Sequence, residues 1–387
     1  MLIPPNLLYN VAKGHSMRAT RTIVHLDKFT SNFRAIQKRV GTERQICVAI
    51  KADAYGHGAS AIASASLEVG ASCLGVATVQ EGTLLRRQGI SAPILLFSQP
   101  LPEEIPQLIE SRLSPFVSDS EFAAMLDHAA AMAKMRLSVH LKIDTGMGRL
   151  GCTPREAPAL AGMLAASAAL EYVGTATHLA VSDSAAPENL AYTERQINLF
   201  SGALEGIRAA GLNPGIVHAA NSGAIVLHPG AWFDMVRPGI LLYGYNAARE
   251  TDTLQVEPVM ELRSKVVLTK EVKKGESVSY GRTWIAPQDT TIAILPVGYA
   301  DGLPRLASNK WQVLIGDNAY PLVGTICMDQ CMADLGSAHK VRRWDDAVVF
   351  GGTAFGADAL AERIGTIPYE VVCNISKRVP RVYTEPR

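Results

Sequence analysis

Lys51 is a residue whose type and position suggest chemistry, because it follows an apolar, strand-like run at residues 46–50. A lysine that leaves a buried strand is dehydrated, and dehydration disfavours its charged form. The neutral amine is a nucleophile that forms a Schiff base with an aldehyde. A plain alternative is a lysine that ends a strand and points to water. The polar, Gly-rich turn at residues 55–58 favours a site instead, because barrel enzymes hold their sites in such loops.

Other reactive groups also follow strand-like runs. They are the segment 144–149 (Asp-Thr-Gly-Met-Gly-Arg), His178, the segment 221–223 (Asn-Ser-Gly) and the segment 237–240 (Arg-Pro-Gly-Ile). With Lys51 they offer an amine, two arginines, an imidazole, and a hydroxyl beside backbone N–H groups. This set suits an anionic cofactor that carries an aldehyde, a phosphate and an aromatic ring.

Alternating strand-like and helix-like segments must position these groups. Eight short apolar runs, bounded by Gly, Pro, Asp or Ser, predict strands at residues 46–50, 73–78, 93–97, 114–117, 137–143, 172–178, 217–220 and 233–237. Helical patterns lie between most of them, at residues 59–69, 120–134 (Ser120 as N-cap), 154–166 (Thr153 as N-cap) and 192–210 (ended by Gly211). Eight such units predict a parallel (β/α)8 TIM-type barrel, with a doubly wound open sheet as the competitor.

The pattern changes after about residue 250. Short strands are expected at residues 265–269, 291–294, 311–315 and 348–350, with one helix at residues 357–364. The sequence therefore predicts an α/β protein with three parts: an N-terminal extension (1–16), a barrel (17–252) and a mainly-β domain (253–387). We expect the strand-like residues 20–27 to pair with the β domain.

Composition narrows the functional classes. Hydrophobic residues make up 48% of the 387 residues and charged residues 19%, with a formal net charge of +1. Such a balance is typical of a globular protein and gives no reason to expect nucleic acid or a membrane as partner. Six scattered cysteines complete no recognisable zinc motif, so we expect no metal, reduced thiols and a cytoplasmic location.

One motif points elsewhere. Residues 146–151 match G-x-G-x-x-G, follow a predicted strand and precede a predicted helix, and Glu171 stands twenty residues after Gly151. This is close to the dinucleotide-binding fingerprint. The motif nevertheless falls inside a series of βα units and leaves Lys51 and His178 unexplained, so the chain-wide pattern outweighs it.

The motifs taken in order resemble those of alanine racemase. They are residues 48–58, 140–151, 221–222 and 237–240 in the barrel, and residues 279–282, 298–302, 327–329 and 378–383 in the β domain. The resemblance runs from Met17 to Arg387.

The resemblance implies a cofactor, pyridoxal 5′-phosphate (PLP), held covalently by Lys51. It implies that the phosphate is bound by Ser222, Tyr383 and the N–H groups around Gly239 and Ile240. Further cofactor contacts are expected from Tyr55, Arg149, His178, Asn221 and Arg237. It also implies that Lys142 is carbamylated (N6-carboxylysine) and supports Arg149; an unmodified lysine facing water is the alternative.

Racemisation of L-alanine and D-alanine needs two bases on opposite faces of the substrate. By resemblance these are Lys51 for the D-face and Tyr280, from a neighbouring subunit, for the L-face. The implied assembly is a homodimer with shared active sites. Arg149 and Met328 would contact the substrate, and the entrance would be lined by Asp183, Tyr299, Arg305 and Arg381.

Arg237 is expected at the pyridine nitrogen of the cofactor. An arginine stays charged and offers only donors, so that nitrogen stays unprotonated and the electron sink is weakened. This favours return of a proton to the α-carbon over transamination or elimination.

Other activities remain open at this point. A serine or broad-specificity racemase fits the same motifs. A barrel-type PLP decarboxylase is disfavoured because residues 327–329 read Cys-Met-Asp where that class has a Cys-Glu-Ser-type segment, and because its usual Gly-rich triple is absent. A PLP-carrying regulatory module would resemble the barrel alone. The physiological role, cell-wall supply of D-alanine or alanine catabolism, is not distinguished.

Overall fold

The computed structural model describes residues 18–246, 248 and 254–384. Its contacts divide the chain into two units. One comprises residues Asp27–Glu257, and the other comprises the segment that ends at Leu26 together with Pro258–Arg387. We call them the barrel unit and the β unit. The expected extension at residues 1–16 lies outside the described residues.

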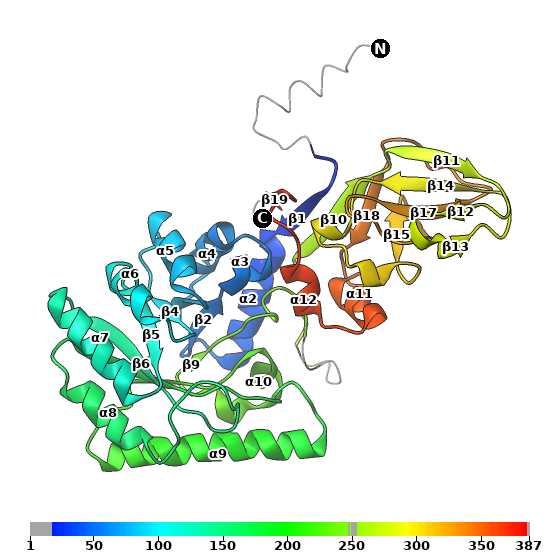
Figure 1. Ribbon diagram of the computed structural model, residues 1–387. Helices are drawn as coiled ribbons and strands as arrows, with labels where there is room; N and C mark the ends of the chain where they lie inside the picture. The colour runs from blue at the N-terminus through cyan, green and yellow to red at the C-terminus, as the bar shows by residue number, and fades with distance from the viewer. Residues whose placement is uncertain (1–17, 247, 249–253, 385–387) are drawn as a thin grey trace. The chain divides into compact units, whose positions relative to one another are not determined.

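Eight parallel strands form the sheet of the barrel unit (Figure 1). They run in the spatial order β8-β7-β6-β5-β4-β3-β2-β9, so the last strand along the chain pairs with the first. Their bounds are β2 (Gln45–Ala49), β3 (Cys73–Val76), β4 (Ile94–Leu96), β5 (Ser114–Val117), β6 (Leu137–Lys142), β7 (Leu170–Ala176), β8 (Ile216–His218) and β9 (Met235–Val236).

Backbone bonds also join β8 and β9, where the sheet closes on itself. The N–H of Asp234 donates to the carbonyl of Val217 at 3.0 Å, and the N–H of Arg237 donates to the carbonyl of Ala220 at 2.8 Å. The (β/α)8 barrel is thereby confirmed and the open doubly wound sheet is wrong.

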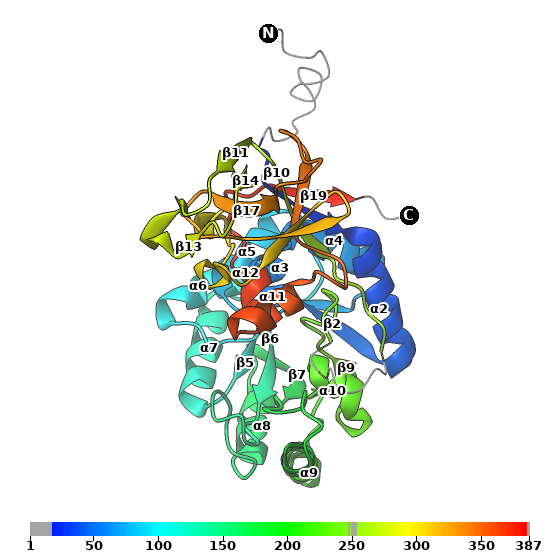
Figure 2. The same cartoon turned by 90° about the vertical axis from the view of Figure 1, so that its right-hand side faces the viewer.

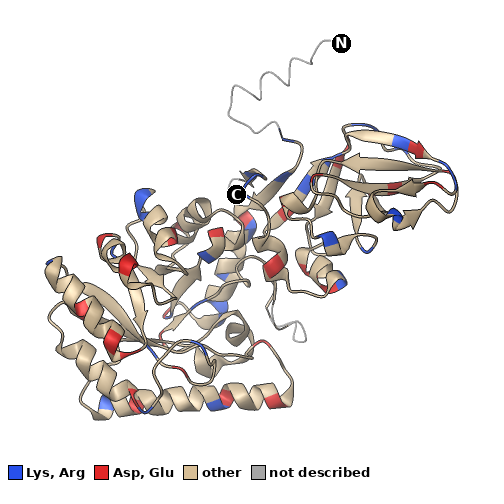
Figure 3. Cartoon of the chain, viewed as in Figure 1, with Lys and Arg blue, Asp and Glu red and all other residues tan. Residues whose placement is uncertain are grey.

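Helices alternate with these strands along the chain. They are α2 (Leu26–Val40), α3 (Lys51–Tyr55), α4 (Ala59–Glu68), α5 (Val79–Arg87), α6 (Ile105–Glu110), α7 (Ser120–Met132), α8 (Ala157–Ala166), α9 (Pro187–Ala209) and α10 (Ser222–Leu227). Acidic and basic residues are interspersed along α9 (Figure 3). No described helix is both long enough and apolar enough to cross a membrane.

Three helix starts differ from the expected ones. The N-cap of α7 is Asp119, whose Oδ1 accepts the N–H of Phe122, so Ser120 is the first helical residue. Thr153 and Glu156 bond reciprocally around an isolated turn, which delays α8 to Ala157. The helix expected from residue 192 begins at Pro187, because proline suits the first helical position.

The described strands of the β unit form three sheets; β11, β14 and β17, which make up one of them, lie together in Figure 2. The largest has the order β16-β15-β18-β10-β1-β19, the second β11-β14-β17, and the third β12-β13. Their bounds are β1 (Arg21–His25), β10 (Met260–Lys265), β11 (Leu268–Val272), β12 (Ser277–Val278), β13 (Trp284–Ile285), β14 (Thr290–Leu295), β15 (Gln312–Ile315), β16 (Asn318–Pro321), β17 (Cys331–Gly336), β18 (Asp346–Phe350) and β19 (Arg381–Thr384), with helices α11 (Ala357–Ile364) and α12 (Pro368–Cys373).

The N-terminal strand belongs to this unit. Val24 on β1 lies opposite Met260 of antiparallel β10 on one side and Tyr383 of parallel β19 on the other. The strand expected at residues 265–269 is wrong, because β10 ends at Lys265 and β11 begins at Leu268 in a different sheet.

Candidate active site

Lys51 follows β2 with Ile50 between them, and the residues after it, labelled α3 in Figure 1, form a left-handed turn. Ala52, Asp53, Ala54 and Tyr55 have φ between 52° and 54°. Left-handed backbone costs a non-glycine residue roughly 1–2 kcal/mol, so four in succession are held only by strong local contacts. The turn places Lys51 at the carboxyl end of the barrel strands, where catalytic groups of this fold reside.

Two hydroxyl groups and a glycine meet beside this turn. The Ser222 Oγ accepts the N–H of Gly239 at 2.9 Å and that of Leu241 at 3.3 Å. A Cβ on Gly239 would lie 2.4 Å from the Tyr55 hydroxyl oxygen, so a larger residue there would require the Tyr55 ring to shift. The structure thus brings together three of the residues expected to bind phosphate, namely Tyr55, Ser222 and Gly239.

Asn221 has a structural role at this place. Its Oδ1 accepts the N–H of Ala224 at 3.1 Å as the N-cap of α10, and it also accepts the hydroxyl of Ser182 at 2.7 Å. Its amide donates to the carbonyl of Leu179 at 3.2 Å. These bonds fix the loop that carries Ser222, and the backbone of Asp183 lies against the same helix start.

Arg237 begins a chain of hydrogen bonds through the barrel interior. Its Nη1 donates to Nδ1 of His218 at 2.7 Å, and His218 Nε2 lies 3.0 Å from Nδ1 of His140. Since a guanidinium only donates, His218 accepts at Nδ1 and therefore carries its proton on Nε2, which donates to His140. Both imidazoles are held neutral: burial and then the charge of Arg237 lower the pKa of His140 to about 3 and that of His218 well below its ordinary value.

Arg237 itself stays cationic, although burial lowers its pKa to about 10. Its Nη2 donates to the carbonyls of Thr177 at 2.8 Å and Ala219 at 3.1 Å. The guanidinium is thereby fixed in direction and offers further chemistry only as a donor.

Positive charge gathers around His178, at the end of β7. Burial lowers the pKa of His178 well below its ordinary value, and four neighbouring cations lower it further. These cations are Lys51, Lys142, Arg149 and Arg237. A neutral imidazole near the charges of Arg237 and Arg149 and near two lysine amines is an environment suited to an anion.

Lys142 is the buried member of this group, with 4% of its surface exposed. Its Nζ donates to the carbonyl of Ile143 at 3.0 Å. Burial, followed by the charge of Arg237, lowers its pKa to about 7, while the carboxylate of Asp144 acts in the opposite direction. A substantial part of Lys142 is therefore a neutral, nucleophilic amine near neutral pH.

The G-x-G-x-x-G segment does not have the geometry of a dinucleotide site. The Asp144 Oδ1 accepts the N–H groups of Gly146, Met147 and Gly148 at 2.8–3.2 Å, so a carboxylate already occupies the donors that a pyrophosphate would need. Helix α8 starts only at Ala157. The loop instead presents Arg149, which is exposed, at the mouth of the barrel.

The β unit gathers three other expected site residues. The N–H of Tyr299 donates to the carbonyl of Cys327 at 3.1 Å, which ties Tyr299 to the segment that carries Met328. The hydroxyl of Thr325, in the same segment, donates to the carbonyl of Tyr280 at 2.8 Å. All three side chains are exposed: 72% for Tyr280, 43% for Tyr299 and 53% for Met328.

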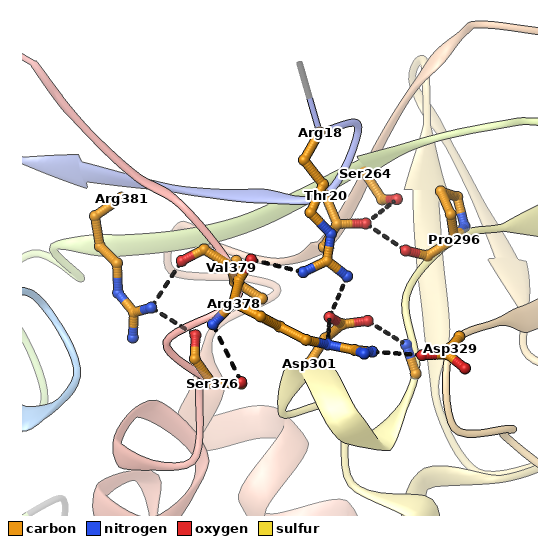
Figure 4. Close-up of polar contacts among 11 residues, drawn as sticks. Arg18, Thr20, Ser264, Pro296, Asp301, Asp329, Ser376, Arg378, Val379 and Arg381 are labelled. Carbon is orange, nitrogen blue, oxygen red and sulfur yellow. Dashed lines mark hydrogen bonds and ion pairs between the residues drawn. The ribbon is translucent and has the colours of Figure 1, made fainter. Parts of the chain in front are cut away.

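A buried carboxylate braces this cluster (Figure 4). Arg18 and Arg378 both bond to Oδ1 of Asp301, and Arg378 continues to Asp329 at 2.8 Å. The Asp301 Oδ2 accepts the N–H of Gly298 at 3.0 Å, so it holds the turn that presents Tyr299. Sequence reasoning assigned no role to Asp301 or Arg378, although both lie in motifs it singled out.

Three further expected site residues lie in the β unit. Arg381 donates to the carbonyls of Ile375, Ser376 and Val379 at 2.6–2.7 Å and so fixes its own segment (Figure 4). Arg305 is exposed on a short 3-10 helix, and Tyr383 lies on β19 with 38% of its surface exposed. Among the described residues there is no cluster of His, Cys, Asp and Glu that could hold a metal ion.

The geometry defines a class of protein: a (β/α)8 barrel with a lysine and a pair of hydroxyl groups at the carboxyl ends of its strands, in one chain with a β unit. Comparison with known families sharpens this. Residues 24–247 match the family "Alanine racemase, N-terminal domain" and residues 259–383 match "Alanine racemase, C-terminal domain". The chain belongs to the alanine racemase family and is an isomerase.

Individual relatives agree over nearly the whole chain. An alanine racemase of Treponema denticola is 47% identical over 95% of this chain and 99% of that protein, and one of Desulforamulus reducens is 41% identical over 93% and 97%. Among solved structures, the alanine racemase of Clostridium difficile 630 has a TM-score of 0.91 at 34% identity, covering 96% of this chain and 97% of that one. The alanine racemase of Bacillus anthracis with bound L-Ala-P has a TM-score of 0.89 at 32% identity, covering 96% of each.

Proposed function

We propose that this chain interconverts L-alanine and D-alanine with PLP as cofactor. The observation that carries the proposal is the meeting of the Ser222 Oγ, the Tyr55 hydroxyl and Gly239 at the carboxyl ends of the barrel strands, where Lys51 also lies. Family membership supports alanine as the substrate. A serine or broad-specificity racemase shares these features and is an outcome of the test below.

The residues fit an anionic, aldehyde-bearing cofactor. The hydroxyl groups of Ser222 and Tyr55 lie beside Gly239 and are small donors of the kind that binds a phosphate. Gly239, Ile240, Ser222 and Tyr55 would hold the phosphate, together with Tyr383. Lys51 would hold the cofactor covalently, with His178 against its ring and Arg237 at its ring nitrogen.

When bound, PLP supplies an electron sink that makes the α-proton of an amino acid acidic. Lys51 takes or returns that proton on the D-face, and Tyr280 of the partner subunit does so on the L-face. Arg149 orients the substrate, and the backbone of Met328 meets its carboxylate. Because the Arg237 guanidinium can only donate, it keeps the ring nitrogen unprotonated and limits the sink, which favours proton return over side reactions.

The exposure of the β-unit cluster supports a homodimer with shared sites. A tyrosine that acts as a base must be shielded from bulk water to be placed against a substrate, yet 72% of the Tyr280 surface is exposed. Tyr280 lines a groove of about 590 Å³ whose other walls are both apolar, as at Val278 and Ile292, and charged, as at Lys270 and Glu276. A second copy that supplies its barrel mouth would cover this face and complete two equivalent sites. Asp183, Tyr299, Arg305 and Arg381 would line the entrance.

Lys142 is proposed to carry a carbamate. Its lowered pKa leaves a neutral amine that can add to CO2. The new N–C bond would form as one N–H proton is released to solvent, and the negatively charged carbamate would lie near the charges of Arg237 and Arg149. The enzyme would act in the cytoplasm, either supplying D-alanine for peptidoglycan or feeding alanine catabolism.

The test is a panel of L-amino acids incubated with the PLP-loaded protein, followed by chiral product analysis. D-alanine from L-alanine is expected, with smaller yields from larger side chains. An amine and CO2 as products would show that the enzyme is a decarboxylase. Faster racemisation of serine than of alanine would show that serine is the preferred substrate. The PLP-loaded protein should be yellow, and the Lys51→Ala variant should hold no covalently bound PLP. A colourless wild-type protein at saturating PLP would overturn the proposal that PLP is the cofactor.

A further inference from the structure

The left-handed turn after Lys51 needs an external anchor. Residues 52–55 occupy a conformation that an isolated chain avoids, and Lys51 is the residue from which the turn departs. Whatever fixes the N–H of Ala52 therefore also fixes the backbone from which the Lys51 amine extends. That anchor comes from a residue twenty-nine positions further along the chain.

Glu81 provides it. One carboxylate oxygen, Oε1, accepts the N–H of Ala52 at 2.7 Å. The other, Oε2, accepts the N–H groups of Ala77 at 2.8 Å and Thr78 at 3.2 Å. A single side chain thus bonds the turn behind Lys51 to the loop between β3 and α5.

The second oxygen alone would suffice for an ordinary helix start. Glu81 is the third residue of α5, and with Thr78 it forms a capping box in which the Thr78 Oγ1 accepts the Glu81 N–H at 3.2 Å. A capping box uses one acceptor on the glutamate. The bond from Oε1 to Ala52 does nothing for α5, so its function lies in the turn.

We propose that Glu81 is a positioning residue for Lys51, acting through the backbone of Ala52. The inference rests on the proposed function for the role of Lys51. On the other side of the turn, Asp53 Oδ1 accepts the N–H of Ala59 at 2.8 Å, which ties the turn to the start of α4. Glu81 holds the end of the turn nearer to Lys51.

Glu81→Gln separates the two duties of the carboxylate. An amide has one accepting oxygen and one donating nitrogen, whereas Glu81 faces N–H donors on both sides. The oxygen will face the side with two donors, Ala77 and Thr78, and the nitrogen will then confront the N–H of Ala52. Glu81→Asp is a second variant: it retains a carboxylate at the helix start, but its shorter side chain does not span to Ala52.

The first readout is amide hydrogen exchange of residues 51–58 in the full-length protein without PLP. Both Glu81 variants should exchange about ten-fold faster there than wild type, the effect of losing a hydrogen bond to a charged group. Thr78→Ala is the matched control, because it removes the other half of the capping box and leaves the Glu81–Ala52 bond. Its exchange at residues 51–58 should equal that of wild type.

The second readout is racemisation by the PLP-loaded proteins. In both Glu81 variants kcat should fall about 10- to 100-fold, because a base displaced by up to about 1 Å transfers a proton less well. The KM should change less than kcat. Thr78→Ala should keep the kcat of wild type. Glu81 variants with unchanged exchange and kcat within two-fold of wild type would overturn the proposal, and so would an equal loss in Thr78→Ala. A wild type without racemase activity would instead overturn the proposed function.

Discussion

Arg237 and His218 are joined by a hydrogen bond of 2.7 Å from Nη1 to Nδ1 inside the barrel. The bond fixes the tautomer of His218, and through it that of His140, so that the whole chain of donors points in one direction. Neither the guanidinium at its head nor the two neutral imidazoles behind it releases a proton near neutral pH. The cofactor nitrogen proposed to face Arg237 would therefore meet a hydrogen-bond donor that does not protonate it.

Arg237→Glu should change the reaction as well as slow it. A carboxylate accepts a hydrogen bond, so it would stabilise a proton on the cofactor nitrogen and strengthen the electron sink. The negative charge left on removal of the substrate's α-proton would then be stabilised for longer. We expect slower racemisation and new formation of pyruvate from alanine. The amino group would pass to the cofactor, so the pyruvate, measured with a coupled lactate dehydrogenase assay, would not exceed the amount of cofactor loaded. Arg237→Lys keeps a donor and should form no pyruvate; equal pyruvate from both variants would contradict the argument.

The buried imidazoles predict how stability depends on pH. The pKa of His140 is about 3 in the folded chain and about 6.5 when unfolded, so between these values the unfolded chain binds more protons. Stability is then fully present above about pH 6.5 and falls as the pH is lowered toward 3, by on the order of a few kcal/mol. In His140→Gln the melting temperature should vary less steeply between pH 6.5 and 4.

The measurement is the slope of melting temperature against pH, because the substitution itself also lowers stability. His128→Gln is the control, since His128 is exposed on α7. Its slope should match that of wild type. A slope in His140→Gln parallel to wild type would show that His140 is protonated in the folded chain.

Lys142 should take up CO2 with a pH dependence of its own. Its pKa of about 7 makes the neutral amine abundant from about pH 7 upward, whereas ordinary lysines, with a pKa of about 10.4, react only at higher pH. With 13C-bicarbonate, one carbamate signal is expected near pH 7.5. It should be absent in Lys142→Arg, which should also lose activity; a signal that persists in this variant would assign it elsewhere.

The barrel could be predicted from the sequence because each of its strands is a short apolar run ended by a polar or glycine residue. Helix α2 could also have been found: Phe29, Phe33, Ile36 and Val40 are buried at helical spacing. The strand at residues 265–269 could not be placed correctly, because a continuous apolar run hides the point where the chain leaves one sheet for another. Sheet membership depends on partners that are distant in sequence.

The same limit applies to the site. Lys51, His178 and Arg237 could be selected by type and by their position after strands. The contact between His140 and His218 joins residues 78 apart that meet because β6 and β8 lie on either side of β7. Thr78 and Glu81 have the spacing of an ordinary capping box. Nothing in that spacing indicates that the other carboxylate oxygen of Glu81, Oε1, accepts the N–H of Ala52.

Gly239→Ala should weaken cofactor binding. The added Cβ would lie 2.4 Å from the Tyr55 hydroxyl oxygen and 3.8 Å from the Ser222 Oγ, so Tyr55 must move from its place beside the proposed phosphate. An increase in Kd for PLP of about ten-fold or more is expected from spectroscopic titration, the cost of one displaced polar contact. Gly202→Ala on α9 meets nothing within 4 Å and should bind PLP normally while gaining up to about 1 kcal/mol of stability. Equal affinity in the two variants would remove Gly239 from the site.

Tyr280→Phe tests the second base and, with it, the shared site. Because the two alanine isomers have equal energy, kcat/KM is the same in both directions for any variant, and rates alone cannot show which base was lost. Exchange of the α-proton in D2O can, because each base acts on one face. In Tyr280→Phe we expect D-alanine still to exchange its α-proton through Lys51 with retention, L-alanine to exchange far more slowly, and racemisation to be lost.

The readout is proton NMR of each isomer with the PLP-loaded variant. Tyr320→Phe, on β16 of the same unit, is the matched control and should exchange and racemise both isomers as wild type does. Mixing Tyr280→Phe with Lys51→Ala extends the test: if sites are shared between subunits, mixed dimers contain one site with both bases intact, and racemase activity should return. Activity that fails to return, in mixtures shown to exchange subunits, would place Tyr280 in the site of its own chain; rapid exchange of L-alanine in Tyr280→Phe would remove it as a base.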